Sequence, residues 1–512
     1  MLEHLFKSIF KTSPLRINFL LITALINSIA NAQQAPNIVL FLSDDQDLYL
    51  HGMKPMHQTQ RLIGARGTTL TNAFTTSPLC CPSRASLLSG MYAHNHRTFN
   101  NSVRGGCNDM HWLKHIEPQA LPVLLQGKGY DTFFAGKYLN EYMGREVPPG
   151  WKEFYGLHGN SRYYNYTLRE NAHNKTYGYV YLTDLLRKRA LKFINERVNS
   201  SKPFFLMLAP PAPHQPFTPA ERHQGLFDGI TALKTPNFNK VFKDKHWLLA
   251  NFEKIPNITL DLMDIYFQKR WESLLAVDEM VAAVIKRLVR QNQLENTYII
   301  YTSDNGYHIG QFAQPFDKRQ PYETDIRVPL LIRGPQISAG TVVNAVAGLI
   351  DLAPTILEWA NIPHPARMDG QSLQPFLVNS DIYDASMDKT YRRSLLIQHH
   401  GEGTVDTYNP SCPWGRNDRL YECNSEAACH CQDAWNNTYS CVRHFSYQVN
   451  RLYCEFSDRE SFVEAYDVDK DIYQMNNNVN EWLPIERGLY SLALANLTRC
   501  AGAASCADII LK

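Results

Sequence analysis

Four short apolar runs stand out along the chain, and each ends abruptly in polar or charged residues. They read NIVLFLSDDQD from residue 37, YDTFFAGK from residue 130, PFFLMLAPPAPH from residue 203 and NTYIIYTSDNG from residue 296. Unbroken runs of this length are typical of parallel strands covered on both faces, although a buried helix has the same pattern. Because ligands gather beyond the carboxyl ends of strands in open α/β sheets, we expect the polar residues after these runs to meet at one edge.

A helical pattern precedes the last of these runs. In residues 271–291 apolar side chains recur at three- and four-residue spacing, namely Leu274, Val277, Val281, Val284, Ile285 and Leu288. Such a stripe is typical of a helix that faces a core. A helix that leads directly into a strand favours an α/β fold around a mainly parallel sheet.

The composition changes after a polar stretch at residues 379–390, and eight of the 11 cysteines lie beyond it. We place a domain boundary near residue 385. This gives a large domain at 33–385 and a smaller disulfide-rich α+β subdomain at 386–512. The sequence CHC at residues 429–431 could be mistaken for a zinc site, but in a secreted chain disulfide bonds are the better interpretation of these cysteines.

The N-terminus has the features of a secretory signal. Lys7, Lys11 and Arg16 precede the apolar stretch FLLITALI, and residues 30–32 form an A-x-A cleavage site. We therefore predict a signal peptide at 1–32; the alternative is a membrane anchor, which needs about 20 apolar residues. Seven N-glycosylation sequons agree with passage through the secretory pathway, with acceptors Asn100, Asn165, Asn174, Asn199, Asn257, Asn436 and Asn496.

The balance of charges argues against two classes of partner. The 512 residues include 51 Lys and Arg against 49 Asp and Glu, a formal net charge of +2. This balance gives no electrostatic case for binding nucleic acid or a membrane surface, and we expect no membrane span in the mature chain. Any anion must therefore be bound locally.

Oxygen-bearing side chains follow two of the predicted strands. Asp44 and Asp45 come after the first run, and Asp304 and Asn305 come after the last. Three carboxylates and one amide oxygen suit Ca²⁺ or Mg²⁺, whereas zinc favours more nitrogen or sulfur. Taken singly, such residues are more often helix caps or turn residues.

The stretch CCPSRASLLSG at residues 80–90 resembles the signature C-x-P-S-R-x-x-x-L-x-G of the sulfatase family. SDDQD, GK and SDNG stand in the order that this family uses, and the resemblance covers nearly the whole mature chain. It implies an alkaline-phosphatase-like α/β/α sandwich. It also implies that Cys80 is oxidised to formylglycine, whose hydrate is the nucleophile. Cys81 is then available for a disulfide, and ten cysteines remain that can pair.

The resemblance also implies roles for individual residues. Arg84 would steady the formylglycine hydrate, and Lys137 and Lys318 would contact the sulfate. His214 would contact the sulfate or protonate the departing sugar oxygen. The implied catalytic residues are thus Cys80, Arg84, Lys137, His214 and Lys318, and the implied ligands of one Ca²⁺ are Asp44, Asp45, Cys80, Asp304 and Asn305.

Each of these residues also has an ordinary structural interpretation, as a solvated lysine, a helix cap or a loop residue. The chain departs from the family pattern at one position. Many members read G-K-W-H where this chain has GKYLNE, so Leu139 replaces a histidine. Asn140 or Glu141 is then a candidate contact to the sugar, and His308 in DNGYHIG is another candidate for substrate contact.

Several longer strings, among them FFAGKYLNEY, KHWL and DKRQPYE, narrow the resemblance to members that act on N-acetylglucosamine 6-sulfate. The leading hypothesis is hydrolysis of 6-O-sulfate esters from N-acetylglucosamine residues of heparan sulfate or keratan sulfate. The lysosome is the favoured location and the extracellular space is the alternative. Formylglycine-generating enzyme would act on the chain during maturation, and a homodimer is a further hypothesis.

Four alternatives compete with this hypothesis. The first is an extracellular 6-O-endosulfatase, but those enzymes carry a long basic insertion that this chain lacks. The second is an arylsulfatase of broader specificity. The third is a glycan-binding relative without activity, which would not require a convertible cysteine. The fourth is a metal-dependent phosphatase, which would more naturally present Ser or Thr and additional histidines.

Overall fold

The four apolar runs form strands β1 (Asn37–Ser43), β3 (Asp131–Lys137), β7 (Phe204–Ala209) and β8 (Thr297–Ser303). These strands are neighbours in a ten-stranded sheet of order β12-β2-β11-β8-β1-β7-β3-β4-β5-β6. The pairs β8 and β1, β1 and β7, and β7 and β3 are all parallel. The prediction of a parallel sheet with its polar ends at one edge is therefore confirmed for these four strands.

The computed structural model describes residues 35–378, 394–403, 420–423, 431–446 and 449–507. The predicted signal peptide at 1–32, the domain boundary near residue 385 and Cys429 lie outside these residues. The other strands of the large sheet are β2 (Thr68–Phe74), β4 (Glu153–Leu157), β5 (Tyr166–Glu170), β6 (His173–Tyr177), β11 (Leu330–Arg333) and β12 (Thr341–Gly348). The α-helices up to residue 300 are α3 (His57–Leu62), α4 (Cys80–Ser89), α5 (Ala93–His96), α6 (Leu121–Gly127), α7 (Leu182–Asn195), α8 (Trp247–Ala250) and α9 (Asn257–Arg290). Later α-helices are α10 (Glu323–Ile326), α11 (Leu352–Trp359), α12 (Gln374–Val378), α14 (Pro484–Leu497) and α15 (Ala503–Ala507).

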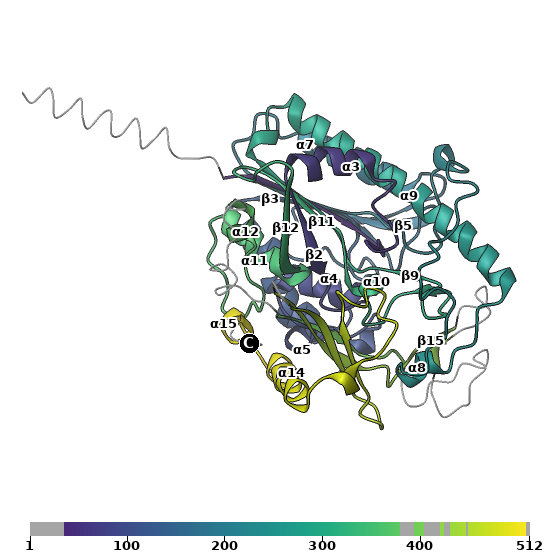
Figure 1. Cartoon of the computed structure of the whole chain (residues 1–512). Coiled ribbons are helices and arrows are strands. Elements are labelled where there is room, and N and C mark those ends of the chain that lie inside the picture. Colours follow the sequence, from purple (N-terminus) through teal and green to yellow (C-terminus); the bar gives the residue numbers. More distant parts are fainter. Residues whose placement is uncertain (1–34, 379–393, 404–419, 424–430, 447–448, 508–512) are drawn as a thin grey trace, which may run out of the picture. The chain divides into compact units, whose positions relative to one another are not determined.

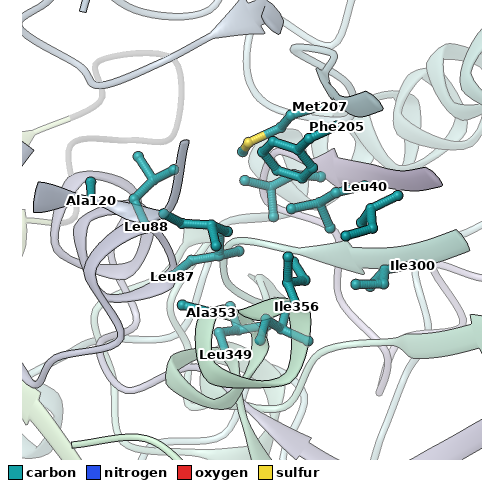
Figure 2. Close-up of a cluster of buried hydrophobic side chains, with 14 of the residues drawn as sticks. Leu40, Leu87, Leu88, Ala120, Phe205, Met207, Ile300, Leu349, Ala353 and Ile356 are labelled. Atoms are coloured by element: carbon teal, nitrogen blue, oxygen red, sulfur yellow. The ribbon is translucent and has the colours of Figure 1, made fainter. Parts of the chain in front are cut away.

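Helices cover both faces of the central strands, as the unbroken apolar runs require. On β1, Leu40 packs in a cluster with Leu87 of α4 and Ile356 of α11. Its neighbour Phe41 points the other way and packs in a cluster with residues of α7 and α9, among them Val277. Figure 1 shows α7 and α9 on one side of the sheet and α4 and α11 on the other, and Figure 2 shows the cluster around Leu40. Each such fully buried side chain stabilises the fold by roughly 1.5–3 kcal/mol.

The helix predicted at residues 271–291 is the second half of α9, which begins at Asn257 and contains 34 residues. Its apolar stripe is buried against the sheet, and it leads directly into β8, as predicted. The first half buries Met263 and Phe267 in a different hydrophobic cluster, while Ile258 and Ile265 are exposed.

A second sheet lies in the C-terminal part of the chain. It is antiparallel, has the order β13-β16-β17-β18, and consists of β13 (Ser394–His399), β16 (Tyr439–Ser446), β17 (Val449–Phe456) and β18 (Val463–Asp467). Two short two-stranded ribbons complete the strands, with β9 (His308–Ile309) and β10 (Phe316–Asp317) in one and β14 (Leu420–Cys423) and β15 (Cys431–Ala434) in the other. The observed architecture confirms the predicted fold class, a mainly parallel α/β sheet followed by a smaller C-terminal sheet.

Within the described residues, no helix combines the length and the apolar character that crossing a membrane requires.

Candidate active site

The oxygen-bearing residues predicted from the sequence meet beyond the ends of β1 and β8. These strands pair in register up to Ser43 and Ser303, so the residues that follow are neighbours. The backbone N–H of Asp45 donates to Oδ1 of Asp304 at 3.0 Å, and Nδ2 of Asn305 donates to Oδ1 of Asp45 at 2.8 Å. The structure thus brings together two pairs of residues that are about 260 positions apart in the sequence.

Cys80 is the first residue of α4 and faces these carboxylates. Its Sγ lies 3.7 Å from Oδ1 of Asp44 and 3.8 Å from Oδ1 of Asp45, and the residue is fully buried. The N-terminus of α4 also favours negative charge at this point, because the first N–H groups of a helix carry partial positive charge. The start of the helix, two carboxylates and the sulfur therefore converge on one small volume.

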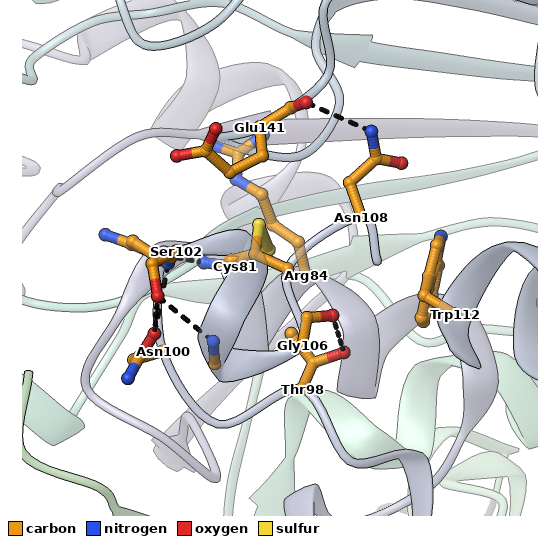
Figure 3. The surroundings of a disulfide bond; sticks show 12 residues. Cys81, Arg84, Thr98, Asn100, Ser102, Gly106, Asn108, Trp112 and Glu141 are labelled. Carbon is orange, nitrogen blue, oxygen red and sulfur yellow. Dashed lines mark hydrogen bonds between the residues drawn. A yellow bond between two sulfur atoms is a disulfide. The ribbon is translucent and has the colours of Figure 1, made fainter. Parts of the chain in front are cut away.

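The two adjacent cysteines have different partners. Cys81 forms a disulfide with Cys107, whereas Cys80 is the one cysteine without a disulfide among those that the structure describes. Figure 3 shows Cys81 beside the loop that carries Asn100 and Ser102, with Arg84 further along the same helix. The expectation that Cys81 is available for a disulfide is confirmed, and Cys80 stands apart from the structural cysteines.

Three basic side chains surround the carboxylates. Nζ of Lys137, at the end of β3, lies 2.9 Å from Oδ2 of Asp44, and Nζ of Lys318, after β10, lies 2.6 Å from Oδ2 of Asp45. Arg84 donates from Nε to Oδ2 of Asp304 at 2.8 Å. All three basic residues are buried.

His214 follows β7 and completes the set of predicted side chains. Its Nε2 lies 3.7 Å from Oδ2 of Asp45. Burial lowers the pKa of His214 to about 4, although the carboxylates of Asp45 and Asp44 oppose this effect. All predicted catalytic residues therefore lie around the Asp44 and Asp45 carboxylates.

Burial and neighbouring charges shift the carboxyl groups in opposite directions. Burial alone would raise the pKa of Asp44, but Lys137, His214 and Arg84 hold it well below its usual range. Burial raises the pKa of Asp304 to about 7, and the negative charges of Asp44 and Asp45 add to the increase. The site therefore contains three acidic and three basic side chains, and an added divalent cation would give it a net positive charge suited to an anionic ester.

The donor atoms at this site fit a hard divalent cation. Asp44, Asp45 and Asp304 offer carboxylate oxygens, which Ca²⁺ and Mg²⁺ prefer. The amide oxygen Oδ1 of Asn305 is buried and has no hydrogen-bond partner within the described part of the chain. Ligand atoms of Asp44, Asp45, Cys80 and His214 all lie within 4.8 Å of one another. Asp304 is not part of this tight group; its Oδ2 accepts a hydrogen bond from Arg84, and its Oδ1 accepts from the backbone N–H groups of Asp45 and Asn305.

A cavity of about 400 Å³ lies next to this group of side chains, and Asp45 of the carboxylate pair is part of its wall. Lys318, His214 and Asn140 also line it. His308 is not among the residues of its wall. Its Nδ1 lies 3.0 Å from the Asp325 carboxylate, and its side chain is buried.

The structure adds residues that the sequence does not single out. Oγ of Ser161 donates to Oδ2 of Asp44, and Arg319 and Glu402 line the cavity. Arg319 is adjacent to Lys318 in the string DKRQPYE, and this adjacency is the only signal in the sequence that points to it. Ser161 and Glu402 lie in loops without a recognisable pattern.

Removal of the Cys81–Cys107 disulfide should destabilise the protein while leaving Cys80 unpaired. We expect the double variant Cys81→Ala, Cys107→Ala to lose about 2–4 kcal/mol of unfolding free energy, because the disulfide restricts the unfolded chain. The residues are 26 positions apart in the sequence. Denaturant unfolding measures the loss. A matched double variant at Cys500 and Cys506, which are only 6 positions apart, should lose less, and the opposite order would contradict this expectation.

Comparison with known proteins identifies relatives that match most of the chain. The family model described as Sulfatase matches residues 36–362. N-acetylglucosamine-6-sulfatase from Capra hircus is 43% identical over 490 residues, which cover 93% of this chain and 86% of that protein. The enzyme of the same name from Homo sapiens is 43% identical over 487 residues, with the same coverage. A homologue of an extracellular sulfatase from Caenorhabditis elegans is 33% identical over 507 residues, which cover 91% of this chain and 71% of that protein.

Solved structures show the same fold. A protein in complex with its substrate D-glucosamine-2-N,6-O-disulfate superposes with a TM-score of 0.71 at 22% identity, covering 90% of this chain and 97% of that chain. A phosphonate monoester hydrolase from Silicibacter pomeroyi superposes with a TM-score of 0.65 at 18% identity, covering 91% and 94%. At these identities the likeness concerns the fold alone, because one fold supports several chemistries.

Proposed function

The chain belongs to the sulfatase family and is a sulfuric ester hydrolase, and on this basis we propose that it removes 6-O-sulfate from N-acetylglucosamine residues of heparan sulfate or keratan sulfate. The observation that carries the choice of substrate is the identity of 43% to N-acetylglucosamine-6-sulfatases over 93% of the chain. Because the C. elegans relative is named as an extracellular sulfatase, an extracellular endosulfatase is the nearest alternative function.

The proposed mechanism assigns one group of residues to a cation and the nucleophile. Formylglycine formed from Cys80 would supply a hydrated aldehyde as nucleophile, and a bound Ca²⁺ would polarise the sulfate ester. Asp44, Asp45, Asp304 and Asn305 would hold the cation through their oxygens, together with the side chain at position 80. Arg84 makes ion pairs with Asp304 and Asp44, and so keeps these carboxylates in place beside position 80.

A second group of residues would act on the sulfate. Lys318 lines the cavity, and Lys137 pairs with Asp44 at 2.9 Å, and both would stabilise negative charge that develops on the transferred group. His214 also lines the cavity and is placed to contact the sulfate or to exchange a proton with the sugar oxygen. Asn140 contributes a buried Oδ1 without a hydrogen-bond partner among the described residues, and we assign it to a sugar hydroxyl.

The proposal includes a route through the secretory pathway. Formylglycine-generating enzyme would convert Cys80 before folding buries it, and the mature enzyme would act in the lysosome or outside the cell. Five of the seven predicted glycosylation acceptors are exposed, whereas Asn100 and Asn436 are half-buried. A sulfated glycosaminoglycan is the proposed macromolecular substrate, and a homodimer stays a prediction.

The proposed function is tested by one protein preparation from a secretory eukaryotic host. The tryptic peptide Gly67–Arg84 should show a mass deficit at Cys80 and react with an aldehyde probe. The same preparation should release sulfate from 6-sulfated N-acetylglucosamine faster than from the 3-sulfated isomer, and should leave the 6-phosphate ester intact. Two unmodified thiols, in a host that converts a control sulfatase, would remove the proposed nucleophile.

A further inference from the structure

Arg319 has an unusual backbone conformation directly beside Lys318. Its φ angle is +91°, in the region that glycine adopts readily and residues with a Cβ avoid. Such conformations persist only where the surrounding structure holds them, and they cluster at functional sites. The direction in which Lys318 leaves the backbone depends on this conformation, because the two residues share a peptide unit.

The side chain of Arg319 is held by carboxylates from two parts of the chain. Its Nε donates to Oε2 of Glu402 at 2.8 Å, and its Nη2 lies 2.6 Å from the same oxygen. Its Nη1 donates to the carboxylate of Asp317. The backbone N–H of Glu402 in turn donates to Oδ2 of Asp433 at 2.9 Å. The side chains of Arg319, Glu402 and Asp433 are buried, so the ion pair between Arg319 and Glu402 has little contact with water although both residues line the cavity.

Both backbone polar groups of Arg319 make hydrogen bonds. Its N–H donates to the carbonyl oxygen of Pro78 at 3.2 Å, two residues before Cys80. Its carbonyl oxygen accepts a hydrogen bond of 2.9 Å from the hydroxyl of Tyr439, at the start of β16. Arg319 therefore joins the segment that leads to Cys80 with the C-terminal sheet.

We propose that Arg319, held by Glu402, is a positioning residue that keeps the backbone at positive φ and so aims Lys318 at the sulfate. Lys318 lines the cavity and reaches Asp45 at 2.6 Å, and its position depends on the neighbouring peptide unit. This inference rests on the proposed function in one respect, that Lys318 binds the sulfate. It assigns a task to the C-terminal part of the chain, which supplies Glu402 and Tyr439.

A direct contact between Arg319 and the substrate is the competing explanation, because Arg319 also lines the cavity. Glycine separates the two explanations. It has no side chain to touch a substrate, but it adopts a positive φ without the help of Glu402. Alanine also lacks the guanidinium group, but its Cβ disfavours this conformation.

The experiment compares Arg319→Ala, Arg319→Gly and Glu402→Gln by steady-state kinetics and by calorimetric titration with inorganic sulfate. We expect Arg319→Ala and Glu402→Gln to lower kcat/KM by about 10- to 100-fold, the range that corresponds to releasing one strained backbone residue. Arg319→Gly should have a kcat/KM at least about tenfold above that of Arg319→Ala, because glycine tolerates the conformation. Adding Glu402→Gln to Arg319→Gly should cause little further loss, because the carboxylate then has no guanidinium to hold.

Equal losses in Arg319→Gly and Arg319→Ala would overturn the inference and assign the side chain to the substrate. A matched control is Gln336→Gly, which replaces an exposed residue of positive φ that is not part of the cavity wall, and which should change neither kinetics nor sulfate affinity.

The sulfate titration distinguishes failure of the positioning role from failure of the proposed function. If the wild type hydrolyses no sulfated sugar, the proposed function fails, whereas the order of sulfate affinities, with glycine above alanine, still supports or overturns the positioning role.

Discussion

Cys80→Ala should abolish turnover of every sulfate ester, with a loss on the order of 10⁴-fold or more, as for removal of the nucleophile in other covalent mechanisms. The sulfur lies between two carboxylates at the start of α4, and no other described cysteine is free of a disulfide. No neighbouring thiol can therefore replace it. Initial rates on 6-sulfated N-acetylglucosamine, measured against enzyme prepared in parallel, provide the test.

A folding control accompanies this variant. Replacing the buried cysteine with alanine removes one heavy atom and should cost about 1 kcal/mol of unfolding free energy, which leaves the protein folded. Cys80→Ser should also fail to turn over, because a serine hydroxyl can attack sulfur but cannot expel sulfate by re-forming an aldehyde. Retention of more than a few per cent of activity in Cys80→Ala would mean that the catalytic group lies elsewhere.

Arg443→Met should lower the unfolding free energy by about 3–5 kcal/mol, the usual result of removing one partner of a buried ion pair. Nε of Arg443, on β16, donates to Oε1 of Glu323 at 2.8 Å, and both side chains are buried. Burial alone would raise the pKa of Glu323, but Arg443 and Arg327 hold it below its usual value of 4.5. Without Arg443, the ion-pair partner that this carboxylate retains among the described residues is Arg327, at 3.1 Å.

The lowered pKa of Glu323 predicts how the effect of Arg443→Met on the unfolding free energy changes with pH. Because the pKa of Glu323 is lowered in the folded protein, the ion pair stabilises the fold above the ordinary glutamate pKa, and this contribution is lost as the pH falls through the lowered value. The difference in unfolding free energy between wild type and Arg443→Met should therefore shrink in acid. The double variant Glu323→Gln, Arg443→Met should recover part of the loss at neutral pH. A constant difference across the pH range would contradict the electrostatic explanation.

The central strands and most of the site could be predicted from the sequence. Each apolar run is a strand buried on both faces, and the polar residues that follow, such as Asp44 and Asp304, meet at one edge because parallel strands end on the same side. The helix predicted at 271–291 is correct in type, but α9 begins earlier, at Asn257, and its first half packs in a different cluster through Met263 and Phe267. His308 lies close to Asp304 and Asn305 in the sequence, but its ring contacts Asp325 and it is not among the residues of the cavity wall. Closeness in the sequence therefore does not by itself place a side chain in the cavity.

Local sequence patterns identify the strand-forming runs, the signature around Cys80 and the residues that we propose to bear the chemistry. These features are local, because a few consecutive residues are enough to indicate a strand buried on both faces or the start of a helix. Contacts from the C-terminal part, made by Glu402 and Tyr439 to Arg319 and by Arg443 to Glu323, are visible only in the folded chain. Such contacts depend on the path of the chain over 80 residues or more, and no local pattern of polar and apolar residues records that path.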